Sequence, residues 1–284
     1  MSETVFLNGQ FVPYEQALIP VEDRGFLFGD GIYEVIAVYG GRFWRMEEHL
    51  DRLERSALAI HLALPMDRRA IRQAAEELLR RNGLAAADAS VYLEVTRGPA
   101  PRAHTFPEDP HPTVVMTARP VAPADPALVE KGATAVTVPD IRWHAVHIKS
   151  ICLLPNVLAK QAAHEAGAFE AILVREGVLT EGSSSNLFLV FDGELQTHPE
   201  GPFILSGVTR GAVLEVARDL SIRLVERAVP LEELWQADEV FVTGTTSEVV
   251  PIVRVDDRPI GDGRPGPVTL RIREELVRRA RGAA

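Results

Sequence analysis

The sequence has a single cysteine and no long hydrophobic run. Cys152 stands alone among the 284 residues, which excludes an intramolecular disulfide and a zinc site made of several thiolates. No stretch approaches the roughly 18 apolar residues of a membrane-spanning helix. The N-terminus lacks a basic region followed by an apolar segment, so we expect a cytoplasmic protein without a membrane partner.

The sequence also lacks a positive net charge and a cluster of metal ligands. The formal net charge is −10 and the isoelectric point is near 5.4, which argues against binding to nucleic acid. The eight histidines form no His-x-x-x-His pair and no cluster with cysteine, so we expect no metal site. A hydrophobic content of 46% is ordinary for a globular protein.

Lysine is the rarest basic residue, because only three of the 30 basic side chains are lysines. An amine can lose its proton and attack a carbonyl, whereas a guanidinium is always charged. Lys131 lies in an expected turn and Lys160 on the polar side of an expected helix. Lys149 lies within the apolar run 145–154, where burial of a charge is costly. It is a candidate nucleophile, or else a strand-end lysine that reaches solvent in an arginine-biased sequence.

Apolar periodicity and turn residues predict a two-domain protein of mixed α and β structure. The expected strands are residues 5–7, 10–12, 31–39, 42–45, 90–96, 113–117, 133–138, 145–151, 170–174, 186–191 and 239–242. The pair Asn8-Gly9 predicts a two-residue hairpin turn between the first two strands. The expected helices are residues 50–60, 68–82, 156–165, 207–220 and 267–280, and Asp67 is the expected N-cap of the second. Three prolines in residues 119–126 predict a stiff linker, so we place an N-terminal domain at 1–118 and a C-terminal domain at 127–284.

Three hydroxyl-rich segments match no hydrolase or nucleotide-binding motif. The segment 180–186 places one carboxylate, Glu181, among serines, but it lacks the second glycine of Gly-x-Ser-x-Gly. The segment 206–209 opens a helix and 243–247 follows a strand, and both offer backbone N–H groups to an anion. Neither contains a Walker or Gly-x-Gly-x-x-Gly pattern. Each segment alone is also typical of an ordinary polar loop or helix cap.

The segment 101–104 presents an arginine and a histidine in a proline-rich stretch. Arg102 and His104 could bind a carboxylate through charge-assisted hydrogen bonds. A solvated loop without a ligand is an equally good interpretation of this spacing.

The combination is more informative than any single segment. An amine in an apolar run, a carboxylate among hydroxyls and two anion-binding loops together indicate a pyridoxal 5'-phosphate site. The lysine would form the Schiff base, the acid would hold the proton of the pyridine nitrogen, and the loops would bind the phosphate.

These residues resemble the fold-type IV pyridoxal-phosphate enzymes over essentially the whole chain. The matching motifs are residues 22–34, 48–53, 148–150, 158–161, 180–186, 207–210 and 245–248. The resemblance implies a small N-terminal α+β domain and a larger C-terminal α/β domain with a pseudo-barrel. It also makes Lys149 the Schiff-base lysine and Glu181 the partner of the pyridine nitrogen.

The resemblance implies further contacts on both sides of the cofactor. The cofactor contacts besides Lys149 and Glu181 would be Arg52, Ser184, Ser185, Asn186, Leu205, Val208, Thr209, Gly244 and Thr245. The substrate contacts would be Tyr33, Val35, Arg102, His104 and Thr246. Gly244 departs from close relatives, which often have a hydroxyl residue there, so one phosphate contact is in question.

Within the family, Tyr33, Arg102 and His104 correspond to the carboxylate-binding residues of D-amino-acid aminotransferases. We therefore expect transfer of the amino group of a D-amino acid such as D-alanine to a 2-oxo acid such as 2-oxoglutarate, with ping-pong kinetics. In that subgroup the Arg–His loop reaches in from the second subunit, which implies a homodimer with shared active sites.

Other functions remain open at this point. A branched-chain aminotransferase, an (R)-amine transaminase or an aminodeoxychorismate lyase could use the same scaffold. A cofactor-binding protein without turnover and a class I aldolase are more distant alternatives.

Overall fold

The computed structural model describes residues 3–122 and 125–282 and divides into two compact units. Unit 1 comprises Met1–Ala122 and Ile148–Cys152, and unit 2 comprises Pro123–His147 and Leu153–Ala284. The segment Ile148–Cys152 thus packs with unit 1, although it lies beyond the predicted linker in the sequence.

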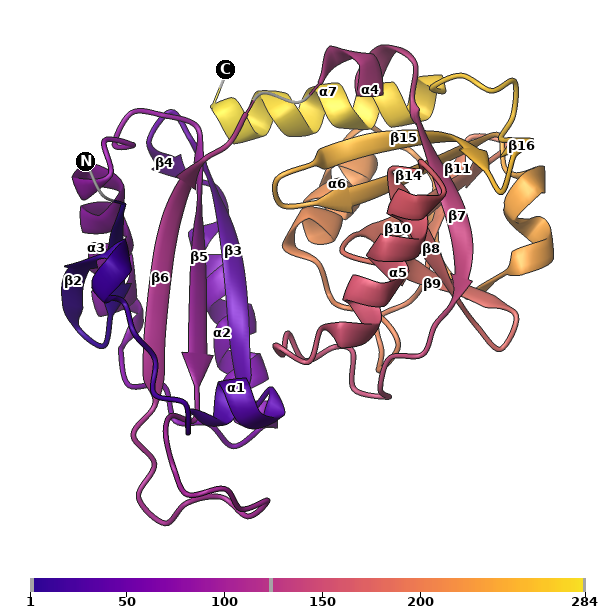
Figure 1. The fold of residues 1–284 in the computed structure, drawn as a ribbon. Coiled ribbons are helices and arrows are strands. Elements are labelled where there is room, and N and C mark those ends of the chain that lie inside the picture. Colours follow the sequence, from indigo (N-terminus) through magenta and orange to yellow (C-terminus); the bar gives the residue numbers. More distant parts are fainter. Residues whose placement is uncertain (1–2, 123–124, 283–284) are drawn as a thin grey trace. The chain divides into compact units, whose positions relative to one another are not determined.

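Unit 1 contains a six-stranded antiparallel sheet in the order β2-β1-β6-β5-β3-β4 (Figure 1). Its strands are β1 (Thr4–Leu7), β2 (Gln10–Pro13), β3 (Gly31–Tyr39), β4 (Arg42–Phe43), β5 (Ala89–Thr96) and β6 (Thr113–Pro120). Its helices are η1 (Tyr14–Gln16), α1 (Arg24–Phe28), α2 (Met46–Ala59) and α3 (Arg68–Arg81).

Local sequence explains several elements of unit 1. Asn8 and Gly9 both have positive φ, 48° and 86°, as the predicted two-residue hairpin turn requires. The side chain of Asp67 accepts a hydrogen bond from the amide of Ala70 at 2.7 Å, which confirms the predicted N-cap of α3.

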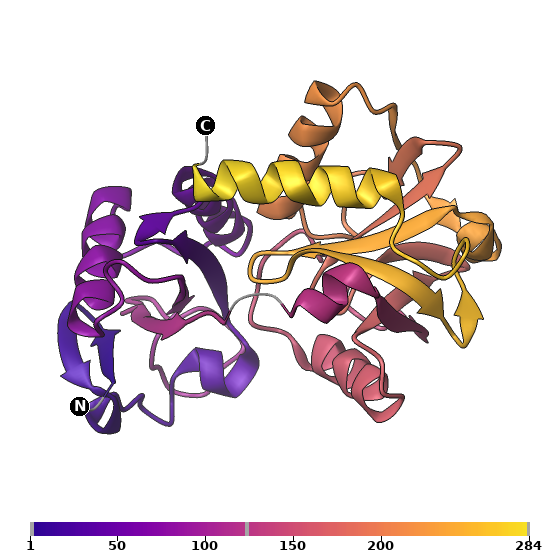
Figure 2. The same ribbon diagram turned by 90° about the horizontal axis from the view of Figure 1, so that it is seen from above.

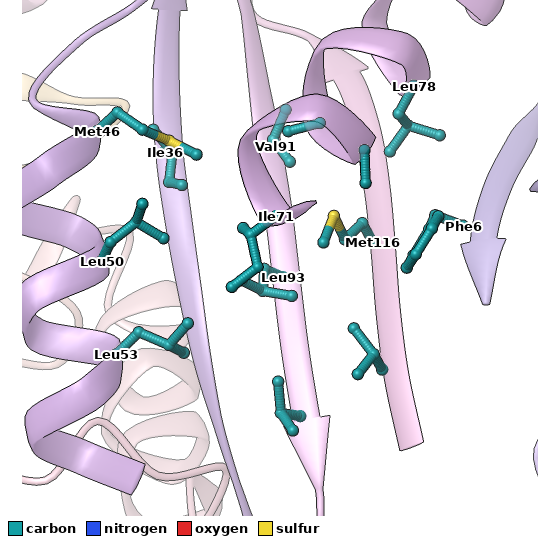
Figure 3. Packing of buried hydrophobic residues seen from close by; sticks show 14 of the residues in the cluster. Phe6, Ile36, Met46, Leu50, Leu53, Ile71, Leu78, Val91, Leu93 and Met116 are labelled. Carbon is teal, nitrogen blue, oxygen red and sulfur yellow. The ribbon is translucent and has the colours of Figure 1, made fainter. Parts of the chain in front are cut away.

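The helices α2 and α3 pack on one face of this sheet. Met46, Leu50 and Leu53 of α2 point toward β3, with Met46 beside Ile36, and Ile71 and Leu78 of α3 point toward β5 and β6 (Figure 3). Because side chains alternate along a strand, this face of β3 contains Ile32, Glu34 and Ile36, and the opposite face contains Tyr33 and Val35. One strand therefore presents an acid to the helices and an aromatic ring to the other side.

Unit 2 contains a ten-stranded mixed sheet with the path β12-β11-β10-β14-β15-β7-β8-β9-β13, and β16 pairs with β15. The strands are β7 (Ala133–Pro139), β8 (Glu170–Arg175), β9 (Val178–Gly182), β10 (Asn186–Phe191), β11 (Glu194–Thr197), β12 (Leu224–Glu226), β13 (Val229–Pro230), β14 (Glu239–Gly244), β15 (Glu248–Val255) and β16 (Arg258–Pro259). The sheet is curled, because β9 and β10 contact each other although four strands separate them along the path.

Helices cover the curled sheet. They are α4 (Pro126–Glu130), α5 (Leu154–Glu165), α6 (Val208–Asp219), η2 (Leu231–Gln236) and α7 (Pro267–Arg281). The helix α5 packs on β7 and β8, and α6 and α7 pack on each other and on β14 (Figure 2). Within the described residues, no helix combines the length and the apolar character needed to cross a bilayer.

Both ends of the predicted linker 119–126 belong to regular secondary structure. The strand β6 continues to Pro120, and α4 begins at Pro126 with Asp125 as its N-cap. Residues 123 and 124 of the predicted linker lie outside the described residues.

The packing of α2 generates a stability prediction. Leu50 is 1% exposed and Leu58 on the same helix is 77% exposed. We expect Leu50→Ala to lower the free energy of unfolding by about 2–5 kcal/mol, because it removes buried methyl groups and leaves a cavity. Leu58→Ala should change it by less than about 0.5 kcal/mol. Urea unfolding measures both, and equal losses in the two variants would contradict this assignment of the core.

Candidate functional site

Lys149 is held against the beginning of β3. Its carbonyl accepts a hydrogen bond from the amide of Tyr33 at 3.0 Å, and its own amide donates to Ser56 Oγ at 3.1 Å. The amine Nζ lies 4.1 Å from the centroid of the Tyr33 ring. The side chain is half-buried, and residue 149 does not lie in a strand.

The predicted strand 145–151 is wrong. The segment forms only an isolated bridge between Ser150 and Ile32, because the backbone groups of Lys149 bond to Tyr33 and Ser56. Ile148, one of the apolar residues that suggested a strand, instead packs against the hydrophobic core of unit 1.

Arg52 belongs to a buried network beside β3. Its Nε and Nη2 each donate to Glu34 at 2.7 Å, and His49 Nδ1 lies 2.7 Å from the same carboxylate. Burial alone would raise the pKa of Glu34, but the ion pair with Arg52 and the contact with His49 outweigh it and lower that pKa to about 2. Burial lowers the pKa of His49. The guanidinium predicted to bind phosphate is thus fixed by an ionised carboxylate.

The sequence analysis did not single out Glu34 or His49. A signal was present, since Glu34 occupies an inward position between Ile32 and Ile36 in an otherwise apolar strand. An acid at such a position needs a buried partner, which His49 and Arg52 supply from one face of α2.

Arg102 and His104 converge on one aromatic ring of unit 1. The Cζ atom of Arg102 lies 5.3 Å from the centroid of Phe28, and the ring of His104 lies 5.6 Å from it. Tyr33 is close to Lys149 and to the ring of Tyr92, 5.7 Å away. Val35 follows on the same face of β3 and is half-buried.

In unit 2, Glu181 lies on β9, which continues to Gly182, and β10 begins at Asn186. The alternative interpretation of segment 180–186 as a polar loop therefore does not hold for Glu181. The carboxylate is 4% exposed and forms an ion pair with Arg142. Its Oε2 accepts hydrogen bonds from Asn186 Nδ2 at 2.9 Å and from the amide of Leu205 at 3.0 Å.

Burial raises the pKa of Glu181 to about 7, against the lowering effect of Arg142 and of the Leu205 amide. Arg142 is shared with Asp140, to which its Nε donates at 2.9 Å and its Nη2 at 2.8 Å. The negative charge of Asp140 adds to the increase at Glu181. Sequence reasoning missed Arg142 and Asp140, because no local pattern distinguishes this arginine from the many others.

Asn186 connects Glu181 to the start of α6. Its Nδ2 also donates to the carbonyl of Leu205 at 2.8 Å. A Cβ atom on Gly207 would lie 1.9 Å from Asn186 Oδ1, so glycine is required for this close approach. Gly207 is the N-cap of α6 and gives the helix no side-chain cap, so the first turn, with Val208 and Thr209, can donate N–H groups to an anion.

The second predicted anion loop is the turn between β14 and β15. A Cβ atom on Gly244 would lie 2.6 Å from Ser247 Oγ, so the Ser247 hydroxyl occupies the space beside the glycine. Thr245 is half-buried and Thr246 is exposed. The Ser247 hydroxyl could therefore make the phosphate contact that a hydroxyl residue at position 244 would make. The sequence analysis did not assign Ser247 this role.

The serines after Glu181 have different surroundings. Ser185 Oγ donates to Glu170 Oε2 at 2.8 Å, and Ser183 donates to the other oxygen of Glu170. Ser184 is exposed. The hydroxyl of Ser185 thus stabilises the turn, and cofactor contacts of Ser184 and Ser185 stay predictions.

The raised pKa of Glu181 generates a prediction on pH. Because folding raises this pKa from its ordinary value to about 7, the folded state binds more protons than the unfolded chain between about pH 5 and 7. The contribution of Glu181 to the free energy of unfolding should fall by on the order of 2–3 kcal/mol as the pH rises from about 5 to 8. The variant Glu181→Gln should lose this contribution to the dependence of stability on pH. The control Glu176→Gln changes an exposed turn residue and should keep the dependence of the wild type. Urea unfolding of the cofactor-free protein measures the slopes, and equal slopes in wild type and Glu181→Gln would contradict the assignment.

Comparisons with known proteins identify the family. The family model described as amino-transferase class IV matches residues 31–255. The chain is 40% identical to a D-alanine aminotransferase of Bacillus licheniformis over 96% of this chain and 95% of that protein. It is 41% identical to a D-alanine aminotransferase of Staphylococcus haemolyticus, over 95% of both chains.

Solved structures agree with this match. The branched-chain amino acid aminotransferase of Escherichia coli gives a TM-score of 0.92 at 28% identity, with coverage of 98% of this chain and 94% of that chain. The branched-chain aminotransferase of Thermoproteus uzoniensis, solved with norvaline, gives a TM-score of 0.91 at 32% identity, with 99% and 96% coverage. The pyridoxal-phosphate form of the enzyme from Thermobaculum terrenum gives a TM-score of 0.89 at 25% identity, with 100% and 95% coverage.

These matches confirm two of the predictions made from the sequence. The fold class is that of the fold-type IV enzymes, and the cofactor is pyridoxal 5'-phosphate. The chain belongs to the aminotransferase class IV family.

Proposed function

We propose that the protein is a pyridoxal-phosphate-dependent aminotransferase that moves the amino group of a D-amino acid, such as D-alanine, to a 2-oxo acid such as 2-oxoglutarate. Relatives named D-alanine aminotransferases, about 40% identical over nearly the whole chain, support this substrate class. The observation that carries the proposal is the link that Asn186 makes between the buried acid Glu181 and the uncapped start of α6.

The side chains fit the cofactor. A phosphorylated pyridine aldehyde needs an amine, an acid for the ring nitrogen and N–H donors for the phosphate. Glu181 is such an acid, and the first turn of α6 has such donors. Lys149 has the amine, and Arg52 has a guanidinium that Glu34 fixes. Thr245 and Ser247 add hydroxyl groups beside the glycine that departs from the family pattern.

Each residue has a defined task in this proposal. When bound, the cofactor supplies an aldehyde that bonds to amines and a ring that accepts the electron pair left at Cα. Lys149 Nζ holds the cofactor, removes the proton from the substrate Cα and later returns one. Glu181, with a pKa of about 7, can share a proton with the ring nitrogen near neutral pH. Alternate binding of the two substrates at one site gives ping-pong kinetics.

Arg102, His104 and Tyr33 would bind the substrate carboxylate. The contacts of Arg102 and His104 with one ring support this, because they bring a guanidinium and an imidazole within reach of one anion. Val35 and Thr246 would contact the rest of the substrate.

A homodimer is part of the proposal, with the Arg102 loop of one protomer in the site of its partner. Leu154, Val157 and Leu158 form an apolar stripe on α5 and are 68%, 59% and 52% exposed. Large exposed apolar groups at such spacing are typical of interfaces. We also propose a cytoplasmic location.

A second candidate is a branched-chain aminotransferase, since the solved structures from Escherichia coli and Thermoproteus uzoniensis are enzymes of that name. Their identities of 28% and 32% are lower than that of the D-alanine aminotransferases, so the D-amino-acid proposal stands first. (R)-Amine transamination and aminodeoxychorismate cleavage on the same scaffold are distinguished by their substrates.

A half-reaction tests the function. We expect D-alanine to bleach the absorbance band of the bound cofactor and L-alanine to leave it. Lys149→Ala should slow transamination by at least about 10²–10⁴-fold, because the group that moves the Cα proton is lost. The exposed Lys131→Ala is the matched control and should keep the wild-type rate. Faster reaction of L-alanine, or near-normal turnover by Lys149→Ala, would refute the proposal.

Mixed dimers test the shared site. Lys149→Ala subunits and Arg102→Leu subunits are refolded together in equal amounts and assayed at low D-alanine. If each site combines Lys149 of one subunit with Arg102 of the other, about half of the dimers are mixed and have one intact site. The mixture should then recover about a quarter of the wild-type activity. No recovery above the sum of the two separate variants would argue against a shared site.

A further inference from the structure

The loop with Arg102 and His104 has little secondary structure of its own. Residues 99–112 contain five prolines, and within this fully described stretch no helix or strand is present between β5 and β6. Arg102 and His104 are both exposed. Side chains that must bind one carboxylate at a defined angle therefore depend on contacts from outside the loop.

Arg24 of α1 holds the middle of this loop. Its Nη1 donates to the carbonyl of Ala103 at 2.6 Å and also approaches the carbonyl of Thr105 at 3.3 Å. These two carbonyls lie on either side of His104. The guanidinium also lies over the Phe28 ring, 4.9 Å from its centroid, which is the ring that Arg102 and His104 contact.

Arg24 is itself held by a second ion pair. It is 3% exposed, and its Nε donates to Asp30 Oδ2 at 2.8 Å. Arg97 donates to both oxygens of Asp30, at 2.8 and 3.0 Å, and to the carbonyls of Ile60 and His61. Burial alone would raise the pKa of Asp30, but the two arginines outweigh it and lower that pKa. One ionised carboxylate thus fixes both guanidinium groups.

The ends of the loop are fixed by backbone contacts. Gly98 has φ of 86°, and a Cβ atom there would lie 1.8 Å from the carbonyl oxygen of His111. The carbonyl of Gly98 accepts a hydrogen bond from the amide of Arg24 at 3.0 Å. The amide of Ala100 donates to the carbonyl of Glu22 at 3.2 Å. These contacts fix the two ends. Between them, Arg24 binds the carbonyls on either side of His104, and Arg97 lies 3.7 Å from the centroid of the Phe106 ring.

We propose that Arg24 is a positioning residue that sets the direction of Arg102 and His104 and thereby the affinity for the substrate α-carboxylate. The inference rests on the proposed function, because it needs Arg102 and His104 to bind that carboxylate. Arg24 itself touches neither the substrate nor the cofactor.

Arg24→Met tests the inference in the cofactor-loaded protein. Asp30 keeps both hydrogen bonds to Arg97 in this variant, so no buried charge is left alone. We expect KM for D-alanine to rise about tenfold, with kcat changed less than about threefold, because the variant loses positioning and not a reacting group. Hydrogen exchange of amides in residues 100–106 should become faster, and the cofactor absorbance should stay unchanged.

Two variants complete the comparison. The variant Arg24→Lys keeps the positive charge, but an ammonium group lacks the planar fork that donates to Asp30 and to two carbonyls at once. Its KM for D-alanine should therefore lie between the KM values of the wild type and of Arg24→Met. Arg55→Met removes an exposed arginine of α2 and should match wild type in KM and in exchange.

Arg102→Leu separates the inference from the function that it rests on. If Arg102→Leu raises KM and Arg24→Met raises neither KM nor loop exchange, the inference is overturned and the proposed function stands. A rise in loop exchange without a rise in KM overturns it as well. If Arg102→Leu leaves KM unchanged, the carboxylate-binding role of Arg102 fails first, and this inference fails with it.

Discussion

Pairing of a carboxylate with an arginine recurs among the residues of the candidate site. Glu34 fixes Arg52, Asp30 fixes Arg24 and Arg97, and Glu181 pairs with Arg142. A buried charge without a partner is costly, so each pair restrains both of its members. Guanidinium suits this task because it stays charged and donates in a planar fork.

The pairs differ in what their carboxylates can do. Glu34 accepts two hydrogen bonds from Arg52 and contacts His49, and these contacts lower its pKa to about 2. The carboxylate therefore stays ionised and fixes the position of Arg52. Glu181 shares its arginine with Asp140, and burial raises its pKa to about 7. The same pair of residue types therefore gives a permanent anchor in one unit and a group able to exchange a proton in the other.

The sequence predicted local structure better than long-range pairs. The turn at Asn8-Gly9, the N-cap Asp67 and the start of α6 follow from residues within one turn of each other, and all three are confirmed. The strand 145–151 was wrong because backbone groups near Lys149 bond to residues about a hundred positions away. Arg142 and Arg24 were missed for the same reason, since the partners that give them a role lie 39 and 79 residues away.

This division of tasks explains why a lysine remains at position 149 in a chain whose basic residues are mostly arginines. Arginines can fix carboxylates, carbonyls and phosphates, but their charge cannot be removed to expose a nucleophile or base. Proton transfer at Cα needs a group that gains and loses a proton, which an amine can do. The position of Lys149 is fixed through its backbone, by Tyr33 and Ser56, while its amine lies over the face of an aromatic ring. Because this anchor uses hydrogen bonds of the main chain, the amine can change its protonation state without loosening the attachment of its own residue.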